Sequence, residues 1–545
     1  MKNKIWQRFK INLLFYAILG IIIALLKSIN TFYFQELLDS YNSKFNPLIL
    51  LMYGITIVLV PILSYIDQNP RTKLYHGIYF FLKKQALEKI SRISYINYTQ
   101  LNSGKLLQKV EAGSSAGRNV YLNFYTRLIR ELLPETLFNL FFIALIDIKL
   151  LIPITIGYIV VFILTKYLLK VLQSLKETSL VSEEKMNHTL IRGITEMVTF
   201  RINKLYKREI ANYEAMSNET VSGLTHMTMI HEMFFGVFAL LVAIIKIVTV
   251  GLFFSGYITV SIGSLVALLI YIDRIYNPIA IFNVIFVQYN LDIISFNRLK
   301  EFFEMDDDRH LNSGVSVKRV SRVDFSGVSV HIDNKDILSG LNYSFKDRNI
   351  YGLVGKSGSG KSTLIKTFLG LLKQSEGKIY IDERDFSEIN LNDFYEQVFY
   401  LSQESPIFSG TLRENIIFDK QIDDERIIEA LRRCQLSEFF EKLPEGLDTT
   451  ISNTTVSGGE KQRIAFARIF FSEANIIILD EATSALDEVT EGLILKELLP
   501  VLKNKMTIMI THRPSNLVIV DTIIDLDKLK EANHKSINQG GNHSE

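Results

Sequence analysis

The chain has 545 residues, of which 48% are hydrophobic and 22% charged, and its 60 Lys and Arg nearly balance its 58 Asp and Glu. This length predicts several domains, and the apolar share with a mean hydropathy of +0.19 predicts a membrane region. The net charge of +2 gives no basic field for a nucleic-acid partner, and the single cysteine, Cys434, excludes an intrachain disulfide framework and a paired-cysteine zinc site.

Apolar runs long enough to cross a bilayer, which takes about 20 residues, are confined to roughly the first 300 positions. The third of them carries Arg130, Glu131 and Glu135 before its apolar half, but an odd number of spans would place the C-terminal half outside. We therefore expect six membrane-spanning helices. They are Ile11–Phe34, Leu48–Ile66, Asn123–Ile146, Leu150–Leu169, Phe234–Phe254 and Val260–Phe286.

Basic residues before the first run predict a cytosolic N-terminus, because Lys and Arg are retained on the cytoplasmic side. These residues are Lys2, Lys4, Arg8 and Lys10. The first run lacks a small-residue cleavage site and is expected to stay in the protein. On this orientation the connections 39–46, 147–149 and 255–259 lie outside, whereas the long charged connections 67–122 and 170–233 project into the cytosol as helical extensions.

Charged residues interrupt several of the apolar runs. Lys27 and Lys246 lie well past the cytosolic edge, where a charge usually faces a cavity or a partner, and there they would favour an anionic or carboxylate-bearing ligand. Snorkelling to the outer interface is the alternative. Asp273 and Arg274 are expected either to pair with each other or to line a path between the helices.

The composition changes after residue 305. Residues 306–322 read as a linker between a transmembrane domain at 1–305 and a second domain at 323–530, where β-branched runs alternate with helical patterns, as in a parallel sheet wrapped by helices. The expected fold class is thus an α-helical six-span membrane domain followed by an α/β domain. Residues 531–545 are expected to be a disordered tail, with His534 and His543 solvated.

The most specific motif is GKSGSGKS at 355–362, which follows the strand-like run 350–354 and precedes the helical run 363–372. In such a loop the glycines turn backbone N–H groups toward a phosphate, and the helix N-terminus adds partial positive charge. Lys361 would reach the β- and γ-phosphates of ATP, and Ser362 would supply an oxygen to Mg²⁺. The sequence therefore predicts a nucleotide site in an α/β P-loop NTPase domain.

Two carboxylates end the apolar run IIILDE at 476–481. Ligands bind outside the carboxyl ends of parallel strands, so Asp480 suits the Mg²⁺ shell. Glu481 would act on the attacking water, as general base or as an electrostatic orienter. Between the two motifs, VSGGEKQR at 456–463 places Ser457 and two glycines before a helix and predicts a second anion site.

The order of the motifs resembles the ATP-binding-cassette (ABC) superfamily: the phosphate loop, Gln403 in YLSQESPIFSGTLRENI, SGGEKQR, IIILDEATSALD and ITHRP. The resemblance covers about 323–529, and with six preceding spans the chain resembles exporter half-transporters. Within them it is similar to bacterial exporters of ribosomally made peptides.

The resemblance implies a dimer in which two cassettes enclose two ATP molecules head to tail. The phosphate-loop side would comprise Gly355, Lys356, Ser357, Gly358, Ser359, Gly360, Lys361, Ser362 and Thr363. It would face Ser457, Gly458 and Gly459 of another chain. Asp487 would lie across the seam, His512 would hold the γ-phosphate, and Gln403 would touch Mg²⁺ or the attacking water. The cytosolic loops near 102–109 and 204–213 would dock on the cassettes beside Gln403.

The chain departs from the pattern of the resembled family at three places. Glu460 replaces the usual glutamine and is expected to face away from the closest contact with the phosphates. Ile332 falls where an aromatic residue would stack on adenine, and His331 beside it is offset in strand phase. The segment 449–455 lacks an acidic residue and a glycine and looks shortened, which would alter communication with the opposite membrane domain.

The resulting hypothesis is an ATP hydrolase that drives export of a peptide or another amphipathic small molecule by alternating access. It would be a multi-pass protein of a bacterial cytoplasmic membrane, surrounded by lipid, with both termini and the cassette in the cytosol. A homodimer is favoured over a heterodimer. No peptidase segment precedes the first span, so leader cleavage by this chain is not expected. The alternatives are a non-transporting membrane ATPase that regulates a partner, or a lipid or drug cargo.

Overall fold

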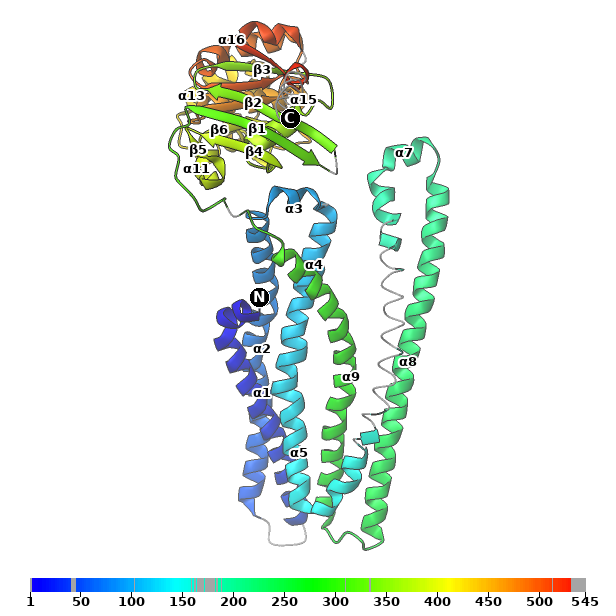
Figure 1. Cartoon of the computed structure of the whole chain (residues 1–545). Helices are drawn as coiled ribbons and strands as arrows, with labels where there is room; N and C mark the ends of the chain where they lie inside the picture. Colours follow the sequence, from blue (N-terminus) through cyan, green and yellow to red (C-terminus); the bar gives the residue numbers. More distant parts are fainter. Residues whose placement is uncertain are drawn as a thin grey trace, which may run out of the picture. The chain divides into compact units, whose positions relative to one another are not determined.

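The structure is a computed structural model that describes residues 2–40, 46–101, 103–157, 189–308, 310–332, 335–511 and 513–530, with a few isolated positions between 159 and 187. The chain divides into two compact units (Figure 1). The helical unit comprises Met1–Ser91 and Leu101–Met305, and the α/β unit comprises Arg92–Gln100 and Asp306–Glu545.

The helical unit is built from long helices. Helix α2 begins at Pro47, where proline costs no hydrogen bond, and Asn46 caps it by accepting from the Leu48 N–H at 3.0 Å. Ser261 caps α9 in the same way, through the Ser264 N–H. The elements are α1 (Lys2–Asp39), α2 (Pro47–Ile90), α4 (Ser103–Asn119), η2 (Val120–Thr126), η3 (Leu128–Leu132), α5 (Leu133–Ile146), η4 (Ile148–Leu150), α7 (Met197–Ile202), α8 (Tyr206–Phe254) and α9 (Ile262–Glu304).

The expected spans fall on these helices. Among the described residues α1, α2 and α8 are long and apolar enough to cross a membrane. The runs 123–146 and 260–286 coincide with the helical stretch η2–α5 and with α9. Most of the run 150–169 lies outside the described residues, although Ile148–Gly157 is a short apolar helix. The predicted fold class, an apolar helical region followed by an α/β domain, is confirmed.

Charged residues inside the helical unit are paired across helices. Lys27 of α1 forms an ion pair of 2.7 Å with Glu135 of α5, and Lys246 of α8 forms one of 2.6 Å with Asp273 of α9. Arg274 donates to the backbone carbonyl of Lys27. The expectation that Asp273 pairs with Arg274 is therefore wrong, because consecutive residues of a helix point in different directions. Snorkelling does not describe Lys27 or Lys246 either, since each ends on a carboxylate.

A third pair is more deeply buried. Arg130 of η3 and Asp67 of α2 lie 2.7 Å apart, and their side chains are 11% and 9% exposed. The Arg130 guanidinium lies over the ring of Tyr16, 3.6 Å from its centroid. A Cβ at Gly20 would collide with the Arg130 side chain, so glycine makes room for this contact between α1, α2 and η3.

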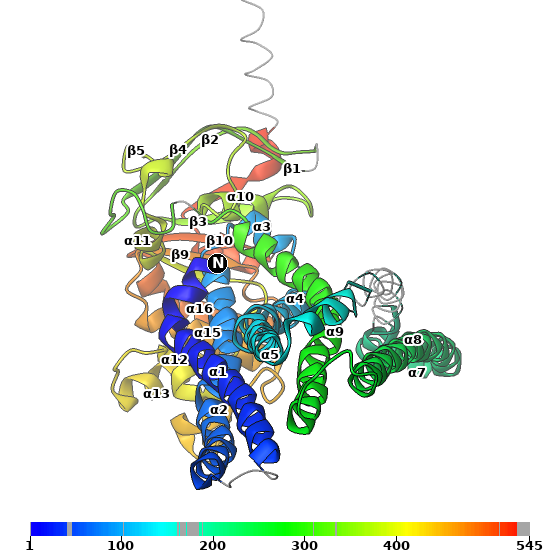
Figure 2. The same cartoon turned by 90° about the horizontal axis from the view of Figure 1, so that it is seen from below.

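The α/β unit contains a parallel five-stranded sheet in the order β11–β3–β10–β9–β6 and an antiparallel sheet in the order β2–β1–β4–β5. In Figure 2, α10 (Lys361–Phe368) lies between the two sheets, and α15 and α16 lie on the other side of the parallel sheet. The strands are β1 (Arg322–Ile332), β2 (Lys335–Lys346), β3 (Ile350–Val354), β4 (Glu376–Ile381), β5 (Arg384–Asp385), β6 (Val398–Leu401), β9 (Ile476–Asp480), β10 (Met506–Ile510) and β11 (Thr522–Asp525).

Side-chain alternation along the strands explains these layers. Ile476 and Ile478 of β9 pack with α10 and β1, whereas Ile477 and Leu479 pack with α15 (Gly458–Ala467) and α16 (Glu488–Leu502). Cys434 is fully buried in the second of these clusters. Both faces of β9 are thus covered, which is why the run is apolar throughout.

The smaller elements of the α/β unit are turns and short helices around the sheets. They are α3 (Tyr95–Thr99), η5 (Phe386–Glu388), α11 (Leu391–Glu396), β7 (Gly410–Thr411), α12 (Leu412–Ile417), α13 (Asp424–Arg433), α14 (Ser437–Glu441), η6 (Gly446–Asp448), β8 (Thr450–Ile451), η7 (Arg468–Phe471) and η8 (Pro514–Ile519).

Candidate functional site

The loop between β3 and α10 has the backbone of a phosphate cradle. Gly355, Gly358 and Gly360 have φ values of +155°, +81° and +98°, which side-chain-bearing residues rarely adopt. A Cβ at Gly355 would lie 2.7 Å from the Ser359 hydroxyl, and one at Gly360 would lie 3.0 Å from the Ile337 carbonyl. Glycine at these two positions keeps the loop open.

Polar groups of this loop fit a polyphosphate. The Lys361 ammonium donates to the backbone carbonyls of Gly355 and Lys356 at 2.8 and 3.0 Å, so its charge lies along the inside of the loop. The buried Ser359 hydroxyl has no hydrogen-bond partner among the described residues, and such groups usually have one. A phosphate oxygen held in the loop would supply it.

The parallel sheet brings the other predicted residues to the same edge. Ile510 of β10 pairs with Asp480 of β9, and Leu479 of β9 pairs with Leu401 of β6. The carboxyl ends of β3, β10, β9 and β6 are therefore neighbours, and they lead into the phosphate loop, residues 511–512, Glu481 and Gln403, respectively. His512 itself lies outside the described residues.

The two carboxylates at the end of β9 have different surroundings. Burial and the charge of Glu481 raise the pKa of Asp480, and a hydrogen bond of 3.1 Å from the Tyr400 hydroxyl opposes this shift. Glu481 has a φ of +47°, and a non-glycine residue in the left-handed region is strained by about 1–3 kcal/mol, a feature that clusters at active sites. The strand thus ends in a fixed carboxylate followed by one on a strained turn.

The SGGEKQR segment begins α15 with a reciprocal cap. Ser457 is the N-cap residue, and the Glu460 carboxylate accepts from both the N–H and the hydroxyl of Ser457, at 2.8 and 2.7 Å. Glu460 therefore turns back onto Ser457, and its orientation relative to the phosphates stays a prediction. The reason for this turn is the capping box, in which the third residue after the N-cap reaches the N-cap N–H.

Gly458 and Gly459 lie against the loop that follows β9. A Cβ at Gly459 would lie 3.4 Å from the Ala485 carbonyl. The Gln462 amide accepts from the Ala485 N–H at 2.9 Å and donates to the Ser484 hydroxyl at 3.1 Å. Asp487 then caps α16 by accepting from the Thr490 N–H at 2.9 Å. Helix α15 is thus tied to residues 484–485, shortly before Asp487.

Comparison with known protein families identifies this arrangement. The family model described as ABC transporter matches residues 338–484, which contain the phosphate loop, Gln403, the SGGEKQR helix and the Asp480–Glu481 pair. The α/β unit is an ABC transporter cassette.

Two curated relatives of this chain have names that describe transport proteins. The chain is similar to an ATP-dependent lipid A-core flippase of Coxiella burnetii, 39% identical over 43% of this chain and 40% of the relative. A probable multidrug resistance ABC transporter ATP-binding/permease protein of Bacillus subtilis is 25% identical over 94% of this chain and 76% of that protein. The chain spans 40%, 34% and 50% of the length of three other curated relatives that it matches.

The whole chain also has a structural counterpart. It superposes on a bacterial Atm1-family ABC exporter with ATP bound, with a TM-score of 0.80, 19% sequence identity and coverage of 100% of this chain and 99% of the other. At this identity the match establishes the fold. The chain therefore has the fold of an ABC exporter, in which an apolar helical region is fused to a cassette.

Two cassette residues that contact the phosphate loop could not be predicted from the sequence. The phosphate loop is held from outside by Asp527, which accepts from the Lys356 N–H at 2.8 Å, and by Lys530, which donates to the Ser359 carbonyl at 2.6 Å. Burial lowers the pKa of Lys530. Both residues follow β11, which pairs with β3, so only the sheet order brings them to the loop.

A buried carboxylate ties the loop after β10 to the loop after β9. Glu491 of α16 is 1% exposed and forms an ion pair with Arg513, and it accepts from the Asn516 amide at 2.5 Å. Arg513 also donates to the Leu486 carbonyl at 2.9 Å. The residue that follows His512 in the sequence is thus anchored to the residue that precedes Asp487.

The expected base-stacking position lies on the antiparallel sheet. Ile332 ends β1, where it pairs with Lys335, and is 38% exposed. The His331 imidazole lies 2.5 Å from the Asp336 carboxylate, so that side chain is engaged within the hairpin. Stacking of adenine on Ile332 stays a prediction.

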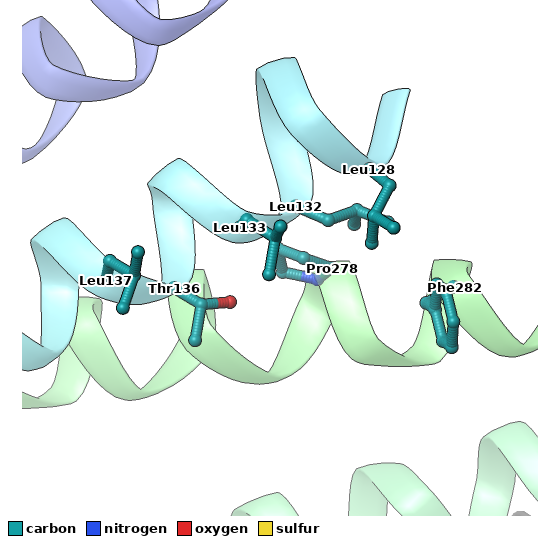
Figure 3. Close-up of a pocket in the computed structure, with 7 residues that line it drawn as sticks. All are labelled: Leu128, Leu132, Leu133, Thr136, Leu137, Pro278 and Phe282. Atoms are coloured by element: carbon teal, nitrogen blue, oxygen red, sulfur yellow. The ribbon is translucent and has the colours of Figure 1, made fainter. Parts of the chain in front are cut away.

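The helical unit contains an apolar pocket (Figure 3). Figure 3 shows side chains from the η3–α5 helix and from α9 lining it, with the Thr136 hydroxyl as the only polar group among those drawn. The lining residues are Leu128, Leu132, Leu133, Thr136, Leu137, Pro278 and Phe282. Pro278 lies inside α9, and the π-helical element η3 directly precedes α5. Proline and π-helical turns both interrupt regular helix geometry, so each of the two helices that line the pocket is irregular there.

Among the described residues, no group of three or more His, Cys, Asp or Glu side chains could hold a metal ion. The described residues therefore give no support for a metal site made of protein groups alone. Mg²⁺ bound through one or two carboxylates plus phosphate oxygens needs no such cluster. Asp480 and the hydroxyl-bearing loop at 357–363 suit that mode, so the residues present fit MgATP.

Proposed function

We propose that this chain is an ABC half-transporter that hydrolyses ATP to export an amphipathic molecule, such as a peptide, across the cytoplasmic membrane. The observation that carries the proposal is the phosphate loop at one sheet edge with Asp480 and Glu481, in a chain whose other unit consists of long apolar helices. The fold shared with an ABC exporter supports it.

The residues of the cassette would divide the chemistry between them. The N–H groups of the loop and Lys361 would hold the phosphates, while Ser362, Gln403 and Asp480 would hold Mg²⁺, which when bound neutralises charge on the β- and γ-oxygens. Glu481 would orient the attacking water, and its strained turn fixes the carboxylate near the end of β9. His512 would contact the γ-phosphate.

A pair of chains would be needed to complete each site. In the described part of the cassette, Ser457, Gly458 and Gly459 form no hydrogen bond with residues 355–363, and they lie against Ala485 instead. We infer that a second half-transporter presents these residues and Asp487 to the loop, most simply a second copy of this chain.

The proposed arrangement in the membrane follows the charge pattern of the sequence. Residues 1–305 would form the transmembrane domain, 306–322 the linker and 323–530 the cassette, with 531–545 as a tail. The N-terminus and the cassette would be cytosolic, because the short connections that would lie outside carry few basic residues. The connection 255–259, which carries none, fits this orientation.

The apolar pocket supports an amphipathic cargo. Leucine, proline and phenylalanine side chains would contact an apolar portion of the cargo, while the Thr136 hydroxyl offers one hydrogen bond. A relative named for multidrug resistance covers most of this chain, so a drug-like or lipid cargo is the alternative to a peptide.

The experiment is ATP hydrolysis by the purified full-length chain in lipid nanodiscs, with Glu481→Gln beside it and mass measurement of the assembly. We expect hydrolysis by a dimer, loss of about 10²-fold or more in the variant, and retained ATP binding. Glu488→Gln, which changes an exposed acid in the first turn of α16, is the matched control. A well-folded dimer that binds ATP without hydrolysing it would overturn the proposal and favour a regulatory ATPase.

A further inference from the structure

A short helix from the long cytosolic connection belongs to the α/β unit. Helix α3 (Tyr95–Thr99) lies within Arg92–Gln100, which clusters with the cassette rather than with the helical unit. The Ser94 N–H donates to the Asp306 carbonyl at 3.2 Å, and the Asp308 N–H donates to the Arg92 carbonyl at 2.8 Å. This contact with the cassette lies earlier in the chain than the predicted position near 102–109, of which residues 103–109 belong to α4 of the helical unit.

Tyr95 is the residue of α3 that meets the nucleotide-binding part of the cassette. The Lys366 ammonium lies 5.8 Å from the centroid of the Tyr95 ring, within the range of a cation–π interaction. Lys366 is in the last turn of α10, the helix that begins with Lys361. The charge of Lys366 also acts on Asp480 and opposes the rise of that pKa.

Tyr400 lies between the same two regions. Its hydroxyl donates to one carboxylate oxygen of Asp480 at 3.1 Å. Burial, and then the nearby charge of Asp480, raise the pKa of Tyr400, and Tyr95 contributes in the same direction.

We propose that Tyr400 is a positioning residue for Asp480, and that Tyr95 and Lys366 connect helix α3 to this hydrogen bond. The inference rests on the proposed function, since it assigns Asp480 to the Mg²⁺ shell. With one Asp480 oxygen held by Tyr400, the other would be left to bind Mg²⁺. A shift of α3 would change the contact between Tyr95 and Lys366 and, through the charge of Lys366, how firmly Asp480 is held.

The connection gives the transport cycle a specific link. Hydrogen bonds that orient a ligating carboxylate typically change metal affinity by 10–100-fold when they are lost. Because binding is reciprocal between coupled sites, magnesium–nucleotide binding would in turn favour one position of α3.

The first test is Tyr400→Phe in the full-length chain in nanodiscs, which removes the hydroxyl and keeps the ring. Mn²⁺ binding in the presence of ATP, followed by electron paramagnetic resonance, should weaken about tenfold, whereas ATP binding in EDTA should stay unchanged. Tyr395→Phe removes a hydroxyl from another partly buried tyrosine of the unit and should leave both unchanged. Unchanged Mn²⁺ affinity in Tyr400→Phe would overturn the proposal.

The second test addresses α3. Tyr95→Ala should weaken Mn²⁺ binding about threefold, an effect on the order of one weak cation–π contact, and Tyr95→Phe should restore it because the ring is retained. Ile96→Ala changes an exposed residue of the same helix and should have no effect. Equal Mn²⁺ affinity in Tyr95→Ala and wild type would remove α3 from the proposal.

The two proposals fail in different ways. If the wild-type chain binds Mn²⁺ with ATP but does not hydrolyse ATP, the transport function is wrong while the role of Tyr400 is still decided by the Mn²⁺ affinity. If hydrolysis is normal and Tyr400→Phe binds Mn²⁺ as wild type does, only the positioning role is wrong.

Discussion

The two units hold their buried charges in different ways. In the cassette the groups that face the phosphates come from short stretches of sequence, such as Gly355–Ser362 and Asp480–Glu481. In the helical unit the charges are paired across 63 positions for Asp67 and Arg130 and across 108 positions for Lys27 and Glu135. A local motif fixes its own backbone geometry, whereas a pair between helices depends on how the helices pack.

The two units also differ in the role of their charged side chains. An isolated charge inside an apolar helical bundle is costly, so pairing is required for the helices to pack at all. At the edge of the parallel sheet, in contrast, Lys361 is held by carbonyl groups of its own loop and is available to a phosphate. Buried pairs in the helical unit should therefore matter for stability, and polar groups of the cassette chiefly for nucleotide chemistry.

The most severe test of this contrast is the Asp67–Arg130 pair. Arg130→Met leaves a buried carboxylate without its cation and should cost about 3–5 kcal/mol, seen as a lower thermal unfolding midpoint and a lower yield of monodisperse protein. The double variant Asp67→Leu with Arg130→Met should recover most of the loss. Lys84→Met, which removes the cation of an exposed pair with Glu88, should leave the midpoint unchanged. An Arg130→Met protein as stable as wild type would break the contrast.

The Glu491–Arg513 pair is a buried pair inside the cassette, and it sharpens the comparison. Arg513→Met should cost about 2 kcal/mol, the magnitude of hydrogen bonds to a charged group, and release the Leu486 carbonyl beside Asp487. We expect a larger loss in kcat for ATP hydrolysis than in ATP affinity, measured on the same nanodisc sample. Arg432→Met, whose partner Glu429 is exposed, serves as control. A change in ATP affinity alone would contradict the assigned role.

Glu460 tests whether a cassette charge affects nucleotide binding without affecting stability. Although its burial opposes the shift, hydrogen bonds from Ser457 hold the pKa of Glu460 below its ordinary value, so the carboxylate is ionised at neutral pH. Glu460→Gln should lower the ATP concentration for half-maximal hydrolysis about twofold, because one negative charge near a polyanion is removed, and the gain should shrink at high salt. A salt-independent change would point to altered helix capping instead.

The smallest effect is expected for an exposed pair of the cassette at low pH. Hydrogen bonds from Lys378 and Ser387 lower the pKa of Asp385 to about 2, below the value of about 3.9 for an unfolded chain. This contribution to stability is complete above about pH 4 and is lost as the pH falls toward 2. Calorimetry of wild type and Asp385→Asn should therefore give melting points that converge as the pH falls through this window. If the melting points of the two proteins differ by the same amount at every pH, Asp385 does not contribute to acid sensitivity.

Much of the cassette could be predicted from the sequence, because its motifs are short and lie at strand ends. The loop at 355–362, the carboxylates 480 and 481, and Ser457 with its two glycines were all predicted by number, and the structure brings the loop, Gln403 and the carboxylates to neighbouring strand ends. The contact of Glu460 with Ser457 was not predicted, since the capping box depends on where α15 begins.

The sequence by itself determined where apolar helices and phosphate-binding motifs occur, because hydrophobic run length and glycine spacing are local properties of the chain. Only the tertiary structure decided that Asp273 meets Lys246, that Tyr400 meets Asp480, and that α3 belongs with the cassette. These contacts join residues far apart in sequence, and they depend on helix rotation and strand order, which the free energy of packing the whole chain selects.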